Sequence, residues 1–256
     1  MRPLKIIGII AAIAVILIGG FGIWFVKVDQ VPVRVITSMF WEPDTAVEHS
    51  DTIVAIEMGS NEDFPLLWKS VGSFLEEHVQ ARVEIIHYRQ TTPAKIQTIN
   101  PKAVVLTGYH QPLETYKLDE MQGLFDFLTT TNLPVLGICG GHQFIGKAYG
   151  KEIVPLGMEE KGFIATALLK DDPIFKGLNS PIKVYYWHKL QVEAIPDDFI
   201  LLSNNENCSI EAMRHKTRPI YGVQFHPEFS TDEFKDGLQI FLNFAEVAGI
   251  EPRKLH

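Results

Sequence analysis

The chain has 256 residues, enough for one ordinary domain and an appendage, and its 46% hydrophobic and 21% charged residues are typical of a globular protein. Its formal net charge is −8, and an acidic chain without a basic stripe does not suit nucleic-acid binding. Two cysteines, Cys139 and Cys208, are too few for a disulfide framework.

Residues 6–26 form an apolar segment of 21 residues without a charge, flanked by basic residues on both sides. At about 1.5 Å per helical residue, this segment spans a hydrocarbon core of about 30 Å. It offers no small-residue cleavage site, and Trp24 fits an interfacial aromatic belt. We therefore expect a single-pass N-terminal membrane anchor over residues 1–27, with a cleaved signal peptide as the alternative. Residues 28–50, which have no sustained period, are expected to be a linker.

From residue 51 onward, apolar strand-like runs alternate with amphipathic helices. Continuous apolar runs are typical of parallel strands buried on both faces, and such sheets are covered by helices with an apolar stripe. The alternation predicts an open, doubly wound sheet with the active site at the carboxyl ends of its strands. The expected strands are 52–58, 82–88, 103–106 and 134–139, and the expected helical stripes begin at Leu67 and Leu118.

Residues 162–215 have a different pattern, with short strand-like runs separated by turns rich in Asp, Asn, Gly and Pro. This pattern predicts a small antiparallel insertion. A last helix is expected to begin at Ser230, with Glu233 completing a capping box. The predicted fold is a three-layer, flavodoxin-like α/β domain over residues 51–250, with an open, mostly parallel sheet and a small antiparallel insertion. One transmembrane helix precedes it, and residues 251–256 form a tail.

The segment Gly137-Ile138-Cys139-Gly140-Gly141-His142 joins an apolar run to a helix-like stretch. Glycines on both sides allow a tight turn that presents Cys139 at a helix N-terminus, where the dipole and free amides favour a thiolate. The arrangement is a nucleophile elbow with cysteine in the serine position. A buried core cysteine is the alternative, because free cysteine is among the most buried residue types.

A second segment is an apolar strand that ends in His226-Pro227-Glu228. A cysteine nucleophile needs a base for its own proton and an acid for the leaving group, and histidine does both near neutral pH. Residues two apart on extended chain point to the same side, so Glu228 can reach the ring of His226 and fix its tautomer. The two segments together predict a Cys139–His226–Glu228 triad.

The motifs G-I-C-G-G-H-Q at 137–143 and G-V-Q-F-H-P-E at 222–228 resemble the two signatures of class I glutamine amidotransferase domains. The likeness extends over roughly residues 50 to 250. It implies hydrolysis of the amide of L-glutamine through a cysteine thioester, with release of ammonia and glutamate. Together with the predicted anchor, the chain is expected to be a membrane-anchored, stand-alone form.

The resemblance also implies donors for the oxyanion that develops in such a reaction. Gly140, directly after the nucleophile, is the first expected donor, and the loop with Gly108 and Tyr109 supplies the second. Tyr109 departs from the family, in which a second glycine is common, and a non-glycine residue at positive φ is strained. The glutamine pocket is matched by Gln143, Trp187 and His188. For Gln143, a helix-surface glutamine is the alternative.

No metal or other cofactor is expected. Four histidines could be read as a zinc set, but their spacing matches no ligand pattern, and a thiolate explains the site without a metal; they are His110, His142, His188 and His226. No synthetase module follows in this sequence, so either the ammonia goes to a synthetase partner subunit or the domain is a stand-alone hydrolase. A γ-glutamyl peptidase-like hydrolase that cleaves γ-glutamyl amides is the second hypothesis. A membrane-tethered, non-catalytic binding protein is the third.

The side of the membrane stays open. Three positive groups precede the apolar segment and two follow it closely, which leans toward an extracytoplasmic catalytic domain. A reactive thiolate is safer in a reducing compartment, which favours the cytoplasm.

Overall fold

The apolar runs in the first half of the chain form parallel strands, as the sequence predicts. The computed structural model describes residues 37–43, 51–59 and 66–253, all within one unit, Val31–His256. The parallel strands lie in the order β2-β1-β3-β4-β9. Their bounds are β1 Thr52–Glu57, β2 Arg82–His87, β3 Ala103–Leu106, β4 Val135–Ile138 and β9 Ile220–Val223.

Helices cover both faces of this parallel region, because alternate strand residues point to opposite sides. On β1, Ile53 belongs to a core cluster that includes α3 and α7 residues, whereas Val54 belongs to one that includes α4, α5 and α6 residues. The helices are α3 Leu66–His78, α4 Pro93–Ile99, α5 Leu118–Thr130, α6 Gly140–Ala148 and α7 Asp236–Val247. Short 3-10 turns occupy Tyr88–Gln90, Leu113–Thr115, Pro173–Phe175 and Pro227–Phe229.

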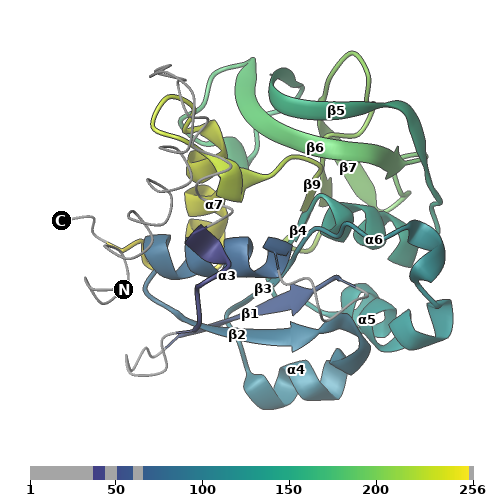
Figure 1. The fold of residues 1–256 in the computed structure, drawn as a ribbon, viewed down its shortest axis with the longest axis vertical. Helices are drawn as coiled ribbons and strands as arrows, with labels where there is room; N and C mark the ends of the chain where they lie inside the picture. The colour runs from purple at the N-terminus through teal and green to yellow at the C-terminus, as the bar shows by residue number, and fades with distance from the viewer. Residues whose placement is uncertain (1–36, 44–50, 60–65, 254–256) are drawn as a thin grey trace, which may run out of the picture. The chain divides into compact units, whose positions relative to one another are not determined.

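The prediction of a mostly parallel sheet with a small separate insertion is wrong. Four antiparallel strands continue the same sheet beyond β9, in the order β8-β7-β5-β6, which gives one mixed sheet of nine strands in the described part of the chain. In Figure 1 the long strands β5 and β6 curl over the upper part of the molecule. The bounds are β5 Ile153–Leu168, β6 Ile182–Val192, β7 Phe199–Asn204 and β8 Ala212–His215.

The curl has a physical cause in the pairing of β5. Residues 167–168 of this strand pair with β7, whereas most of its length pairs with β6. A bulge between Pro155 and Glu160 interrupts the β5–β6 ladder, and bulges increase the local twist of a strand pair. The strongly twisted β5–β6 pair therefore bends away from the parallel strands rather than extending them as a flat edge.

The predicted membrane-spanning helix is also corrected. In the ranges that the structure describes, no helix is both long and apolar enough to cross a membrane, and residues 6–26 lie outside those ranges. The described structure therefore contains no element that corresponds to the predicted transmembrane helix or to the membrane location inferred from it.

Part of the expected linker lies against the domain. The indole Nε1 of Trp41 donates to Glu76 Oε2 at 2.7 Å, and the six-membered ring of Trp41 covers Gly72, where a Cβ would clash with the ring carbons. At the other end of the chain, Pro252 forms a bridge with Val79, so the start of the predicted tail also contacts the segment that follows α3. The last helix begins at Asp236, not at Ser230, whose hydroxyl donates to Pro227 O.

Candidate active site

Cys139 lies in a sharp turn between the end of β4 and the start of α6. Its φ is 50° and its ψ is −102°, a strained conformation for a residue with a side chain. The turn is fixed by the amide of Cys139, which donates to Val223 O on β9 at 2.8 Å. Gly141 lets α6 approach β3, because a Cβ there would lie 2.6 Å from the carbonyl oxygen of Leu106. The chain thus has the elbow that the glycine pattern predicts.

His226 and Glu228 lie just after β9, the strand beside β4. His226 Nδ1 is 2.7 Å from Glu228 Oε1, and both side chains are buried. The imidazole stacks on Phe229 with a centroid distance of 4.9 Å, which restricts rotation of the ring. The backbone amide of His226 donates to Tyr185 O on β6, so the antiparallel half of the sheet also holds this residue.

Electrostatics favour a charged His226. Burial alone would lower its pKa, but the carboxylate of Glu228 and the neighbouring Cys139 outweigh burial and raise the pKa of His226 to about 10. A histidine with this pKa is an imidazolium at neutral pH. An adjacent imidazolium favours the thiolate form of a cysteine, so the arrangement can supply a nucleophile and a proton donor together.

Tyr109 does not adopt the strained backbone that a glycine-like position would demand, since its φ is not positive. Its ring instead lies directly over Gly140, where a Cβ would clash with Tyr109 Cδ1. The ring also packs against Tyr116 and Phe144, with centroid distances of 5.1 and 5.4 Å. Tyr109 and Gly140 are therefore neighbours, and Gly108 lies in the buried segment just before Tyr109.

Gln143 and Trp187 both lie near Cys139. Gln143 is on the first turn of α6 and is buried, not on the helix surface. The carbonyl oxygen of Trp187 lies 3.9 Å from Cys139 Sγ. Its ring lies between His110, in an edge-on contact at 4.9 Å, and Lys161, whose Nζ is 4.3 Å from the ring centroid. Among the predicted pocket residues, Trp187 thus contributes a backbone group to the site and a partly exposed ring beside it.

His188 belongs to a separate buried cluster. Its Nδ1 bonds to Leu190 O at 2.9 Å and its Nε2 lies 3.0 Å from Glu160 Oε2. The ligand atoms of Glu160, His188 and Glu211 lie within 4.8 Å of one another, a set that could hold a metal ion. However, side-chain amides already donate to these carboxylates: Asn205 to both, and a second asparagine to Glu160. A cation would have to displace those donors.

The four histidines considered as a zinc set do not gather into one. Among the residues that the structure describes, the three-residue group above is the only candidate metal cluster, and it contains just one of the four. His142 is fully buried against Gly222, and burial lowers its pKa to about 3. His142 therefore packs between α6 and β9.

Gln224 is a site residue that the sequence patterns did not single out. It is fully buried, and its Nε2 lies 3.6 Å from Cys139 Sγ. The signal that could have found it was its place inside the G-V-Q-F-H-P-E motif, two residues before His226. Because strand residues two apart face the same side, a polar residue there could have been expected to point toward the same site.

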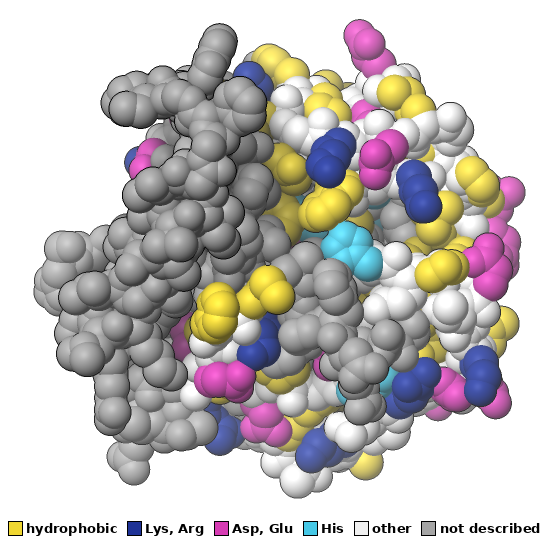
Figure 2. Space-filling view, in the orientation of Figure 1, with side chains coloured by type: hydrophobic (Ala, Val, Ile, Leu, Met, Phe, Trp, Pro, Cys, Tyr) yellow, Lys and Arg dark blue, Asp and Glu magenta, His cyan; other side chains and the backbone are white. Residues whose placement is uncertain are grey.

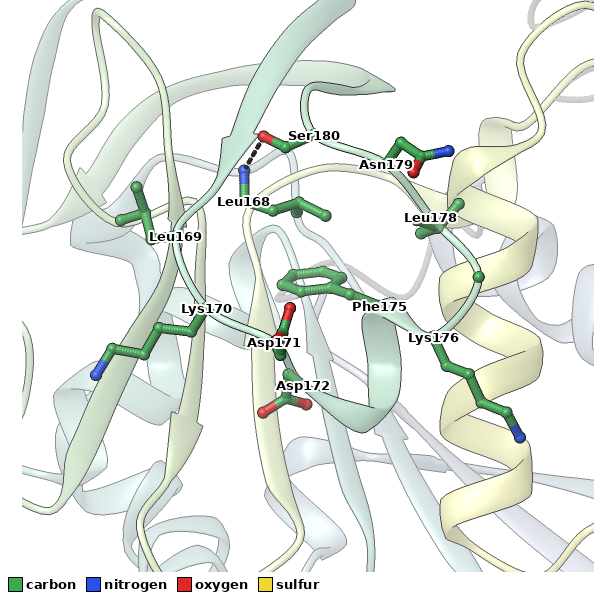
Figure 3. Close-up of a pocket in the computed structure, with 11 residues that line it drawn as sticks. Leu168, Leu169, Lys170, Asp171, Asp172, Phe175, Lys176, Leu178, Asn179 and Ser180 are labelled. Atoms are coloured by element: carbon green, nitrogen blue, oxygen red, sulfur yellow. Dashed lines mark hydrogen bonds between the residues drawn. The ribbon is translucent and has the colours of Figure 1, made fainter.

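A cavity of about 580 Å³ elsewhere in the fold does not contain the residues of the candidate active site. It is lined by residues 168–172 and 175–180, around the ends of β5 and β6 next to α7 (Figure 3). Phe175 lies in the middle of these residues, while Lys170 and Lys176 extend outward on either side. None of the predicted triad residues lines it, and its charged groups do not converge. On the face in Figure 2, basic and acidic side chains of the described residues are interspersed, with no broad patch of one sign.

Comparison with known proteins agrees with this geometry. A family model described as class-I glutamine amidotransferase matches residues 73–246. A subunit of the glutamine-hydrolyzing GMP synthase of Methanothermobacter thermautotrophicus is 35% identical over 158 residues, covering 61% of this chain and 81% of that protein. The corresponding GMP synthase subunit of Pyrococcus abyssi is 37% identical over 160 residues, covering 62% and 82%.

Solved structures resemble the fold as well. A crystal structure described as a candidate GMP synthase subunit from Thermoplasma acidophilum has a TM-score of 0.67 and 28% identity, and the match covers 79% of this chain and 96% of that one. A glutamine amidotransferase from Thermotoga maritima matches with a TM-score of 0.55 and 18% identity, over 79% and 84% of the two chains. The second likeness concerns the fold alone.

Proposed function

Because the chain belongs to the class I glutamine amidotransferase family, we propose that it hydrolyses the side-chain amide of L-glutamine through a thioester on Cys139. The observation that carries this proposal is the position of Cys139, strained at its elbow, beside the buried His226–Glu228 pair. A thiolate next to an imidazolium is poised for attack on a carboxamide carbon.

The reaction proceeds in two halves. Cys139 Sγ forms a bond to the amide carbon, and the C–N bond breaks as His226 gives its proton to the departing ammonia. The product is a γ-glutamyl thioester. Neutral His226 then takes a proton from water, the resulting hydroxide attacks the thioester carbon, and glutamate leaves as the Cys139 thiolate is restored. Glu228 holds the ring orientation and stabilises the imidazolium in both halves.

The developing negative charge on the amide oxygen needs donors. The backbone amide of Gly140 is the first donor, at the start of α6, where the helix dipole adds to the effect. The loop of Gly108 and Tyr109 lies beside it and supplies the second. On the substrate side, the proposed glutamine pocket includes Gln143 and the backbone of residues 187–190, which Gln143 contacts through Leu190 O.

We further propose that the ammonia passes to a synthetase partner subunit. The relatives named as subunits of a glutamine-hydrolyzing GMP synthase support this choice over a stand-alone hydrolase. The alternative, cleavage of other γ-glutamyl amides, uses the same thioester and differs only in the leaving amine.

The test measures ammonia and glutamate release from the full chain, with a panel of γ-glutamyl amides in parallel and with the Cys139→Ala variant as control. We expect glutamine to be hydrolysed and the variant to be inactive. Hydrolysis that survives in Cys139→Ala would overturn the proposal. A strong preference for substituted γ-glutamyl amides over glutamine would replace it with the alternative.

A further inference from the structure

The sulfur of Cys139 faces a side-chain amide in addition to His226. Gln224 has no exposed surface, and its backbone amide donates to Glu211 O at 2.8 Å, which ties it to the segment just before β8. Its terminal nitrogen lies 3.6 Å from Cys139 Sγ, within hydrogen-bond range for sulfur. Whether this contact favours thiol or thiolate depends on which end of the amide faces the sulfur.

One backbone carbonyl decides that orientation. Leu190 O can only accept, so the Gln143 atom 2.8 Å from it must be the NH2 group. The oxygen of Gln143 therefore faces Tyr109, whose hydroxyl donates to it at 2.7 Å. The second hydrogen of the Gln143 amide goes to Gln224 at 3.1 Å, which makes the facing atom of Gln224 its oxygen. The NH2 group of Gln224 is then left for Cys139.

We propose that Gln224 is a catalytic residue that stabilises the Cys139 thiolate through its side-chain N–H, with its orientation set by Gln143 and Tyr109. The inference rests on the proposed function, since it concerns the same nucleophile. A thiolate is a much better acceptor than a thiol, so a fixed donor at the sulfur favours the reactive form. The hydrogen-bond acceptor near the sulfur, Trp187 O, is farther away at 3.9 Å, so it stabilises the thiol form only weakly.

The relay also gives Tyr109 a definite task in this chain. Its ring packs on the start of α6, and its hydroxyl donates a hydrogen bond to the side-chain carbonyl of Gln143. With Tyr109, Leu190 and Gln224 as partners, the amide of Gln143 is satisfied by the protein alone. Gln143 therefore acts here as the link between Tyr109 and Gln224, a positioning residue for the donor at the sulfur.

The test is alkylation of Cys139 by iodoacetamide, a small neutral electrophile that does not depend on the glutamine pocket. The full chain is labelled at neutral and at alkaline pH, and the modified residue is identified by peptide mass spectrometry. Gln224→Leu removes the donor, and Gln143→Leu removes the group that orients it. Gln122→Leu, at an exposed glutamine of α5 bonded to Asp126, is the matched control.

At neutral pH we expect Gln224→Leu to slow alkylation of Cys139 by about ten- to hundredfold, the effect of removing a hydrogen bond to a charged group. Gln143→Leu should slow it less, because the Gln224 amide can then turn either end to the sulfur. At alkaline pH, above the ordinary range of a thiol, both rates should approach that of the unmodified chain. The control should match the unmodified chain at both pH values.

Two results overturn the inference in different ways. If Cys139 of the unmodified chain is alkylated while Gln224→Leu matches it at neutral pH, or is slowed equally at both pH values, the donor has no role in thiolate formation. If the unmodified chain is not alkylated at Cys139 at neutral pH, the nucleophile of the proposed function fails, and the inference fails with it.

Discussion

Replacing Glu228 with glutamine tests how the triad fixes the proton on His226. Glu228 Oε1 accepts from His226 Nδ1 at 2.7 Å, while its second oxygen has no hydrogen-bond partner among the described residues. A glutamine has the same shape but must place an NH2 group at one of these two positions. The unpartnered position offers no acceptor, whereas His226 Nδ1 can become one.

The energetics favour the orientation of the Glu228→Gln amide that prevents His226 from acting as a base. With its oxygen toward Nδ1–H, the variant buries an NH2 group without a partner, at a cost of about 1–3 kcal/mol. With its NH2 toward Nδ1, only an oxygen is left without a partner, as in the unmodified chain. The second orientation puts the ring proton on Nε2, the nitrogen left for Cys139, so neutral His226 cannot accept a proton there. The variant also loses the carboxylate that raises the pKa of His226.

We therefore expect Glu228→Gln to lower kcat/KM for glutamine hydrolysis by about 10³- to 10⁴-fold, or about 4–5.5 kcal/mol of transition-state stabilisation. Glu228→Ala should lose less, because it removes the carboxylate without adding a donor. The assay is glutamate release at neutral pH, with nitrogen NMR of His226 to identify the tautomer and thermal melting to verify folding. Activity of Glu228→Gln within about tenfold of the unmodified chain, or above that of Glu228→Ala, would refute the reasoning.

Four further outcomes are expected. Cys139→Ala should abolish hydrolysis without changing the melting temperature. A glutamine-analogue electrophile should label Cys139 and spare Cys208, because Cys208 is fully buried and burial raises its pKa. Labelling of Cys208 alone would contradict the assignment of Cys139 as the nucleophile. His226→Ala should cost at least about 10⁴-fold in kcat, since triad members act as a unit; near-normal turnover at saturating glutamine would show that it is not the base. In the folded chain the pKa of His226 is raised to about 10, so the stabilising contribution of its charge is fully present below the unfolded pKa of about 6.5. Both the activity and this contribution to stability should decline as pH rises through about 10. A decline in activity centred at about pH 6.5 would contradict this. Burial, and after it Glu160, raises the pKa of Glu211, so the folded state loses stability as pH rises above the ordinary glutamate range. Glu211→Gln should therefore melt at a higher temperature than the unmodified chain at neutral pH but not in acid. Equal changes in melting temperature at both pH values would count against a neutral Glu211.

Local signals in the sequence were sufficient for the parts of the site that depend on neighbouring residues. The elbow at Cys139 follows from glycines next to it, and the approach of Glu228 to His226 follows from a spacing of two residues. The contact between Gln224 and Cys139 joins residues 85 positions apart. The two-residue spacing can place Gln224 on the same side as His226, but it does not give the distance to Cys139. A local pattern also does not show which residues of a stripe reach the core. Leu118 continues an apolar stripe in the sequence, but it is the first residue of α5 and is exposed.

The antiparallel half of the sheet shows why the predicted fold failed where it did. Turn residues correctly marked the strands of this region as antiparallel, but which edge they join depends on pairing between β8 and β9, not on their own sequence. The capping box expected at Ser230 failed for a similar reason. Its hydroxyl donates to Pro227 O in the 3-10 turn that carries Glu228, so the residue stabilises the triad turn rather than a helix start.

The placement of the antiparallel strands matters for the proposed chemistry, because one group near the sulfur belongs to them and others are held in place by their carbonyls. Trp187 O and Leu190 O belong to β6, and Tyr185 O, also on β6, accepts from the amide of His226. The parallel strand β4 supplies only the elbow. The proposed nucleophile at the end of β4 thus lies near a carbonyl of the antiparallel strand β6, and other β6 carbonyls hold Gln143 and His226 in place. This arrangement requires the two halves to form one continuous sheet. Substitutions that loosen the β5–β6 pair should therefore impair Cys139 reactivity before they impair the parallel core.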